Sequence, residues 1–296
     1  MNEPGRASSA DVSDPATFGE DLAGNFRDIA AIAAEHCGDC ADYHIVFSGR
    51  RFANPASGIA TDRARIVDTV TALLAARAGA DDPIDVLIVG SSDTGLLATA
   101  AHAAVLAGRD VTARIRYTVV DRCGTPLELC ARYGRRHRLD VTTHRAAVPD
   151  TSLAASGDVI LVHSLFRVVP RERHRELVAL LARWLKPGGR VVFSQALRPP
   201  GDHLRRPPLI GRLVALMEAG DVAPPEPLET FLARLDRHLA AEAAVSGDYA
   251  TREDLLALFD GSPLAVLEEA EVGRDVVVDG RPARRRRVIA VLAHAV

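Results

Sequence analysis

The chain has 296 residues, of which 48% are hydrophobic and 25% are charged, and its formal net charge at pH 7 is -3. These values are typical of a globular protein and exclude a disordered or fibrous chain. They also lack the strong positive charge that attracts nucleic acid or an anionic membrane. No apolar run reaches the roughly 18 residues of a membrane-spanning helix, and the N-terminus has no basic and apolar signal regions. We therefore expect a cytoplasmic protein.

The N-terminal third is expected to be disordered at first and then helical. Residues 1–20 are rich in Ser, Asp, Pro and Gly, which predicts a disordered segment. Apolar residues then recur at helical spacing, which favours one or two helices between 21 and 47 and another from about 61 to 78. A loop is expected at 48–58. We interpret residues 21–80 as a helical cap.

From residue 81 to residue 197, short apolar runs alternate with helical segments. The expected strands cover about 84–89, 115–120, 139–143, 159–162 and 190–194. The helices between them cover about 95–106, 126–136 and 171–184. This alternation predicts a parallel sheet with helices on both faces.

A proline-rich segment interrupts this alternation at residues 198–247. It contains two amphipathic helices, at about 209–219 and 228–244, and an insertion of this size between core elements favours a lid. Residues 248–296 then complete the core. Two final strands, at about 264–272 and 287–292, are expected to pair antiparallel, and the basic run 284–287 beside them is interpreted as a solvated hairpin end.

The strongest candidate for a ligand site is the turn between the strand at 84–89 and the helix that begins at Gly95. Gly90 and Gly95 let the backbone approach a ligand closely, and the helix N-terminus offers unpaired N–H groups. The dinucleotide fingerprint is absent because Ser92 and Asp93 stand where it needs glycine and a neutral residue. Asp93 would repel a pyrophosphate and attract an ammonium or sulfonium group. A plain structural turn is the alternative.

A second candidate follows the next strand. Asp121 ends the run at 115–120, and an acid at this position can accept hydrogen bonds from both hydroxyls of a ribose. The alternative is that Asp121 caps the following helix. Further on, the segment 185–189 reads Leu-Lys-Pro-Gly-Gly between a helix and a strand, which is mostly a structural signal.

Together these features resemble the class I S-adenosylmethionine-dependent methyltransferases over about residues 84–200. The resemblance implies a doubly wound, seven-stranded, mostly parallel Rossmann-like sheet, and S-adenosyl-L-methionine as the cofactor. Ile88 stands where the family usually has an acid, so Asp93 is expected to bind the methionine ammonium. By position, the resemblance assigns cofactor contacts to Gly90, Ser91, Ser92, Asp93, Gly95, Asp121, Arg122, His163 and Ser164.

His163 is the best candidate for a general base, because it follows the fourth strand and has an ordinary pKa near 6.5. The alternative is a histidine that only makes hydrogen bonds at a strand end. Tyr43 and His44 are also assigned catalytic roles, on a cap helix lying over the cofactor.

Residues 36–44 read His-Cys-Gly-Asp-Cys-Ala-Asp-Tyr-His. Cys37, Cys40 and His44 could supply three zinc ligands, whereas Cys123 and Cys130 belong to another element. A helix would also place the three on one face for packing. We predict no metal site, and the role of this cluster stays open.

The sequence thus predicts a methyltransferase acting on an O or N nucleophile of a small molecule, a bacterial metabolite. One alternative is a related enzyme that cyclises or cleaves S-adenosylmethionine itself, and another is a non-catalytic binding or scaffold protein. The expected partner is a small-molecule substrate and not nucleic acid or a membrane, and a homodimer is left open.

Overall fold

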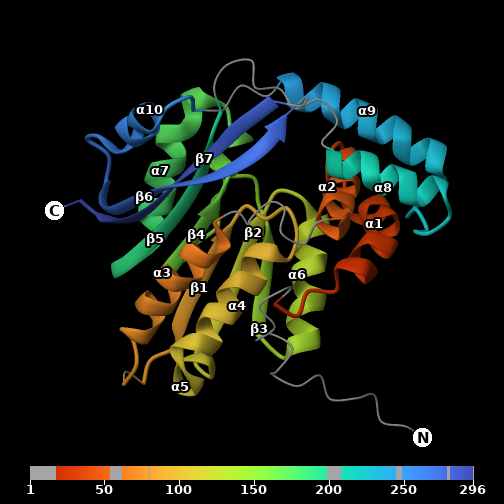
Figure 1. Cartoon of the computed structure of the whole chain (residues 1–296). Coiled ribbons are helices and arrows are strands. Elements are labelled where there is room, and N and C mark those ends of the chain that lie inside the picture. Colours follow the sequence, from red (N-terminus) through yellow and green to blue (C-terminus); the bar gives the residue numbers. More distant parts are fainter. Residues whose placement is uncertain are drawn as a thin grey trace, which may run out of the picture.

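The computed structural model describes residues 18–53, 62–79, 81–198, 208–244, 249–278 and 281–295. These residues form one sheet with helices on both faces, and a group of helices stands beside it (Figure 1). Among the helices described, none is both long and apolar enough to cross a membrane.

The sheet has seven strands in the order β3-β2-β1-β4-β5-β7-β6. Their bounds are Ile84–Val89 (β1), Ile115–Asp121 (β2), Asp140–Arg145 (β3), Gly157–His163 (β4), Leu185–Leu197 (β5), Leu264–Val278 (β6) and Arg281–His294 (β7). Strands β1 to β5 are parallel, whereas β7 is antiparallel to both β5 and β6. The doubly wound, mostly parallel sheet and its antiparallel final pair are confirmed, and β6 and β7 are longer than predicted.

The helices are α1 (Leu22–His36), α2 (Ala41–Ala53), α3 (Arg63–Ala75), α4 (Gly95–Ala107), α5 (Arg109–Thr112), α6 (Gly124–His137), α7 (His174–Trp184), α8 (Pro208–Glu218), α9 (Leu228–Ala244) and α10 (Arg252–Leu256). Within the described residues, short 3-10 helices cover Leu165–Arg167, Arg171–Arg173 and Ala257–Phe259.

Alternation along the buried strands supplies both faces of the sheet with apolar side chains. In β1, Val86 and Ile88 pack in the cluster formed with α3, α4 and α6. Leu87 and Val89 pack in the opposite cluster, with α7 and α10. Because successive strand residues point to opposite faces, a sheet covered on both sides requires strands that are mostly apolar, as β1 is.

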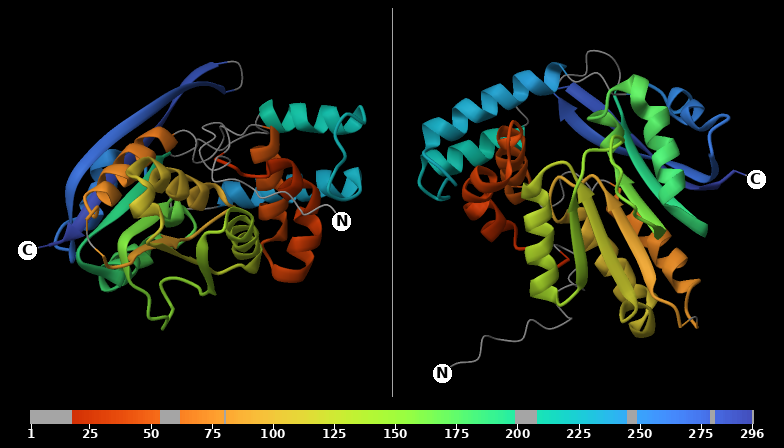
Figure 2. Two further views of the ribbon diagram at one scale, coloured as in Figure 1. Left: turned by 90° about the horizontal axis from the view of Figure 1, so that it is seen from below. Right: turned by 180° about the vertical axis from the view of Figure 1, so that it is seen from behind.

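The remaining helices, α1, α2, α8 and α9, share a third apolar cluster of their own. The views in Figure 2 show this group beside the sheet, with the insertion helices against the N-terminal ones. Ile210, Leu213, Met217 and Phe231 of the insertion are buried in this cluster. These side chains therefore join the insertion to α1 and α2, and we name the four helices together the cap.

The structure differs from the prediction at three places in the N-terminal third. Phe18 and Glu20 are buried, so the segment expected to be disordered contributes to the core in its last residues. Helix α2 continues to Ala53, into the expected loop, and residues 54–61 lie outside the described part. Helix α3 packs on α4 and the sheet, because Ile66, Val70 and Leu74 belong to the sheet's own cluster.

Candidate active site

The turn after β1 is built around Gly90. This residue has φ +74°, in the left-handed region that favours glycine, and a Cβ would lie 2.7 Å from Cδ1 of Leu165. The N–H of Gly90 donates to the carbonyl of Val120 at 2.8 Å, which continues the β1–β2 pairing into the turn. The chain can therefore turn tightly at the carboxyl end of β1 and enter α4 at Gly95.

Asp121 connects the ends of β1 and β2 through backbone hydrogen bonds. Its carboxylate accepts from the N–H of Ser91 at 2.9 Å and from the N–H of Cys123 at 2.7 Å. Burial raises the pKa of Asp121 above its usual range. An ionised carboxylate offers about four acceptor positions, so two hydrogen bonds leave roughly two for a ligand. Arg122 beside it is exposed.

Asp93 has two partners within the protein. One carboxylate oxygen accepts from the N–H of Gly95 at 2.8 Å, at the start of α4, and the other accepts from Nε of Arg51 at 2.8 Å. Arg51 lies in α2 and is almost fully buried. Its positive charge balances Asp93, so an ammonium group bound here would share the Asp93 carboxylate with Arg51.

Arg51 also belongs to a buried charged network that reaches the N-terminal segment. Its Nη2 donates to Oε2 of Glu20 at 2.6 Å, and Nη2 of Arg63 donates to the same oxygen at 3.1 Å. The other oxygen of Glu20 accepts from Oγ1 of Thr94 at 2.6 Å. The network therefore fixes the cap to the turn after β1 and to α3.

Tyr43 of α2 reaches the same turn. Its hydroxyl lies 2.5 Å from Oγ of Ser92, and its ring packs against Phe47 and His238. Burial raises the pKa of Tyr43 to about 12, so the phenol stays protonated at neutral pH. Tyr43 therefore links α2 to the turn after β1, with a side chain suited to hydrogen bonding.

His163, at the carboxyl end of β4, faces a buried carboxylate. Its Nε2 lies 3.3 Å from Oδ1 of Asp62, the residue that precedes α3. The other carboxylate oxygen accepts from Nε of Arg287 at 3.0 Å and from the hydroxyl of Ser194. Nη2 of Arg287 also donates to Oγ of Ser164 at 2.7 Å. We name these five residues the His163 cluster.

The charges of the His163 cluster determine its protonation at neutral pH. Burial and the nearby Arg287 lower the pKa of His163 below its usual value of 6.5, against the opposing effect of Asp62. Burial alone would raise the pKa of Asp62, but Arg287 and His163 hold it well below its usual range. A neutral imidazole beside an ionised carboxylate can accept a proton and have the resulting cation stabilised.

Three members of the His163 cluster were not found from the sequence. Asp62 resembles a helix cap, yet its side chain makes no capping hydrogen bond to α3 and turns to His163. Ser194 lies inside a buried apolar strand, where a polar residue is itself a signal. Arg287 was expected to be solvated, but it is only 9% exposed because its guanidinium enters this cluster. That expectation is wrong for Arg287.

The structure places His44 among sulfur atoms. Single ligand atoms of Cys37, Cys40, His44 and Cys123 all lie within 4.8 Å of one another. Cys123 directly precedes α6, and its distance of 86 positions from Cys37 concealed this proximity in the sequence. Cys130 lies on α6 and is buried elsewhere.

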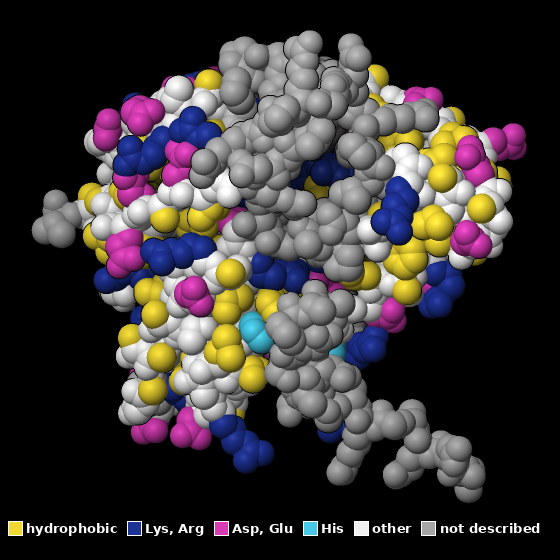
Figure 3. Space-filling view, in the orientation of Figure 1, with side chains coloured by type: hydrophobic (Ala, Val, Ile, Leu, Met, Phe, Trp, Pro, Cys, Tyr) yellow, Lys and Arg dark blue, Asp and Glu magenta, His cyan; other side chains and the backbone are white. Residues whose placement is uncertain are grey.

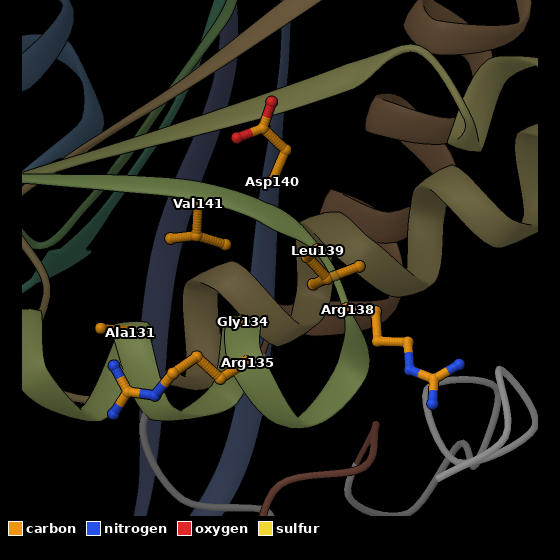
Figure 4. A pocket seen from close by; sticks show the side chains of 7 residues that line it. All are labelled: Ala131, Gly134, Arg135, Arg138, Leu139, Asp140 and Val141. Atoms are coloured by element: carbon orange, nitrogen blue, oxygen red, sulfur yellow. The ribbon is translucent and has the colours of Figure 1, made fainter. Parts of the chain in front are cut away.

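A hollow lies at the end of the sheet opposite to the turn after β1. It is open and is lined by residues of α6 and of β3, including Arg135, Arg138 and Asp140 (Figure 4). Because Asp140 begins β3 whereas Asp121 ends β2, this hollow is separate from the turn after β1. On the face shown in Figure 3, acidic and basic side chains are mixed among the described residues.

The chain resembles known proteins in sequence pattern and in fold. Residues 93–193, from the turn after β1 to β5, match the family model described as a methyltransferase domain. No curated protein matches the chain. The sheet and this match confirm the recognition made from the sequence.

Among solved structures, one match is the N-methyltransferase NodS from Bradyrhizobium japonicum WM9 in complex with S-adenosyl-L-homocysteine, with 13% identity and a TM-score of 0.39 over 77% of this chain and 87% of that one. A second is an O-methyltransferase family 2 protein from Planctomyces limnophilus in complex with apigenin, with 14% identity and a TM-score of 0.44. This match covers 77% of this chain and 61% of that one. A third is the mitomycin 7-O-methyltransferase MmcR, with 14% identity and a TM-score of 0.48 over 99% and 74%.

Proposed function

The chain carries a class I S-adenosylmethionine-dependent methyltransferase domain, and from this premise we propose that it methylates an oxygen or nitrogen atom of a small molecule. The observation that carries the proposal is the His163–Asp62 pair, at the same end of the sheet as Asp121. Val89 and Val162 are paired in the sheet, so the turn at Gly90 and His163 lie at the same level of neighbouring strands.

The residues around this turn fit the cofactor. Asp121 keeps free acceptor positions for ribose hydroxyls, and Gly90 brings the backbone close to the space beyond β1. The rest of this turn is formed by Ser91, Ser92 and Gly95. The hydroxyl of Tyr43 contacts Ser92 and so fixes the cap to the turn. When bound, S-adenosylmethionine supplies a methyl group on a positively charged sulfur. Asp93 is proposed to hold Arg51 and α4 in place rather than to contact the ammonium group.

His163 is proposed to accept the proton of the acceptor's O–H or N–H group. Its Nε2 is directed to Asp62, which leaves Nδ1 for the acceptor. Asp62 orients the ring and stabilises its protonated form. Arg287 and Ser194 hold the Asp62 carboxylate in turn, and Ser164 contacts Arg287. A buried site also excludes water, which favours transfer to the bound acceptor.

A small acceptor is favoured by the charge distribution. The net charge is -3 and the charges on the visible face are mixed (Figure 3), which does not favour a nucleic-acid substrate. Arginine replaces lysine almost throughout, as a GC-rich coding bias would produce, and we propose a bacterial metabolite in the cytoplasm as the acceptor.

The decisive experiment is calorimetric titration of the purified chain with S-adenosylhomocysteine, followed by mass spectrometry of reactions with S-adenosylmethionine and candidate acceptors. We expect binding and an acceptor-dependent gain of one methyl group. Methylthioadenosine formed without an acceptor would indicate cyclisation or cleavage of the cofactor instead. Absence of binding would indicate a scaffold protein and contradict the proposal.

A further inference from the structure

Four metal-binding side chains meet where the cap contacts the loop after β2. Cys37 follows α1, Cys40 precedes α2, His44 lies in α2, and Cys123 precedes α6. The Sγ atoms of Cys37 and Cys40 are 3.8 Å apart, and those of Cys37 and Cys123 are 3.3 Å apart. One ligand atom from each of the four lies within 4.8 Å of all the others.

This spacing is close to that of a tetrahedral metal site. With Zn–S bonds of about 2.3 Å, tetrahedral geometry places two sulfur ligands about 3.8 Å apart. Three sulfurs and an imidazole are also the donor set that zinc prefers over hard cations such as magnesium or calcium. All four cysteines are free in the structure, so no disulfide accounts for the proximity of these sulfur atoms.

His44 supplies the fourth donor of this group. Its Nδ1 is buried and has no hydrogen-bond partner among the described residues. Buried polar atoms of this kind are rare in folded proteins and require an explanation, such as a bound ion. The imidazole lies in the sulfur cluster, where a metal ion can take a lone pair of a ring nitrogen.

We propose that one Zn²⁺ ion is bound by Cys37, Cys40, His44 and Cys123. This structural site fastens the cap to the loop after β2. Four protein ligands complete a tetrahedral sphere and leave no open position for catalysis. None of these four residues is proposed to take part in methyl transfer. The proposal rests on the four donor atoms and their spacing, and it does not depend on which reaction the chain catalyses.

The position of this site connects it to the cofactor residues. The N–H of Cys123 donates to Oδ1 of Asp121, and Tyr43, the neighbour of His44, contacts Ser92. An ion bound to both Cys123 and His44 therefore fixes two contacts of the turn after β1. Thr125 supports the arrangement, since its Oγ1 lies 2.9 Å from Sγ of Cys37.

The first test measures metal in the full-length protein, purified without chelators from zinc-supplemented cells, by inductively coupled plasma mass spectrometry. We expect one zinc ion per chain, and loss of most of it in Cys37→Ser and Cys123→Ser. Cys130→Ser is the matched control, because Cys130 is a buried cysteine of α6 outside the group, and it should retain the metal. Zinc that is absent from the wild type, or unchanged in Cys123→Ser, overturns the proposal.

The second test needs no variant and so does not depend on whether a substituted chain folds. Zinc is replaced by Co²⁺ in the wild-type chain, and the visible spectrum is recorded. Tetrahedral cobalt with thiolate ligands gives intense d–d bands and sulfur-to-metal charge transfer. Weak octahedral bands, or a disulfide between Cys37 and Cys123 found by mass spectrometry of the untreated chain, would contradict the assignment. Neither readout requires methyltransferase activity.

Discussion

The carboxylate of Asp62 lies 3.3 Å from Nε2 of His163, although 101 positions separate the two residues in the chain. Asp62 stands where a helix cap is expected, but its side-chain hydrogen bonds go to β4, β5 and β7 instead of to α3. An aspartate that leaves a helix start uncapped gives up the stabilisation of a cap, about 1 kcal/mol. We propose that the function of Asp62 is instead to orient His163.

Replacing His163 tests its role as the base. We expect His163→Asn to lower kcat by about 10²–10⁴-fold, the usual contribution of a general base. Its affinity for S-adenosylhomocysteine should stay within about twofold. The measurements are steady-state kinetics and calorimetry. His294→Asn is the control, because His294 is exposed and is the last residue of β7. Full activity of His163→Asn would remove the residue from the mechanism.

The low pKa of His163 predicts the pH dependence of the reaction. Because burial and Arg287 hold this pKa below 6.5, the imidazole is neutral at pH 7 and becomes protonated only in acid. Turnover that depends on it should therefore be constant above about pH 6.5 and fall as the pH decreases through the lowered pKa. The same shift means that the unfolded chain binds a proton first, so the His163 contribution to folding stability is lost as the pH falls. A kcat profile that falls on the alkaline side instead would contradict this assignment.

Asp62→Asn separates positioning from proton transfer. The substitution removes the negative charge that raises the pKa of His163 and leaves Arg287, which lowers it. We expect a lower kcat and a shift of the acidic limb of the pH profile to lower pH. A merely structural role of Asp62 would reduce stability without moving that limb. Thermal unfolding of the same variant provides the comparison.

Asp121 is expected to control cofactor affinity. Asp121→Ala removes the proposed ribose acceptor together with two backbone hydrogen bonds. Affinity for S-adenosylhomocysteine should fall at least tenfold, about 1.4 kcal/mol. Asp140→Ala is the matched control, an exposed acid at the opposite end of the adjacent strand, and it should bind normally. Unchanged affinity in Asp121→Ala would exclude the residue from the cofactor site.

The network of Glu20 should contribute to stability much more than surface ion pairs. Glu20→Gln removes a fully buried charge that faces Arg51 and Arg63, and breaking such a buried pair costs about 3–5 kcal/mol of unfolding free energy. Asp254→Asn breaks an exposed pair with Arg171 and should cost less than about 1 kcal/mol. Urea unfolding of both variants measures the difference, and equal effects would contradict the role of Glu20.

Local sequence patterns determined most of the sheet. Apolar runs such as 84–89 and 159–162 are buried on both faces, so the residues themselves require helices on either side. The glycine turn and the acid after β2 were also recognisable, because a tight turn at Gly90 and an acid at Asp121 depend on residues close in sequence. These features rest on interactions within a single strand–turn–helix unit.

What the sequence alone determined was therefore the fold class and the end of the sheet where we propose the site. Only the tertiary structure decided which side chains meet there. Packing of α3 brings Asp62 to His163, the β5–β7 pairing brings Arg287 to Ser194, and docking of the cap brings Cys37 to Cys123. Partners separated by 86 or more positions leave no periodic trace in a sequence, since their proximity depends on how whole elements pack.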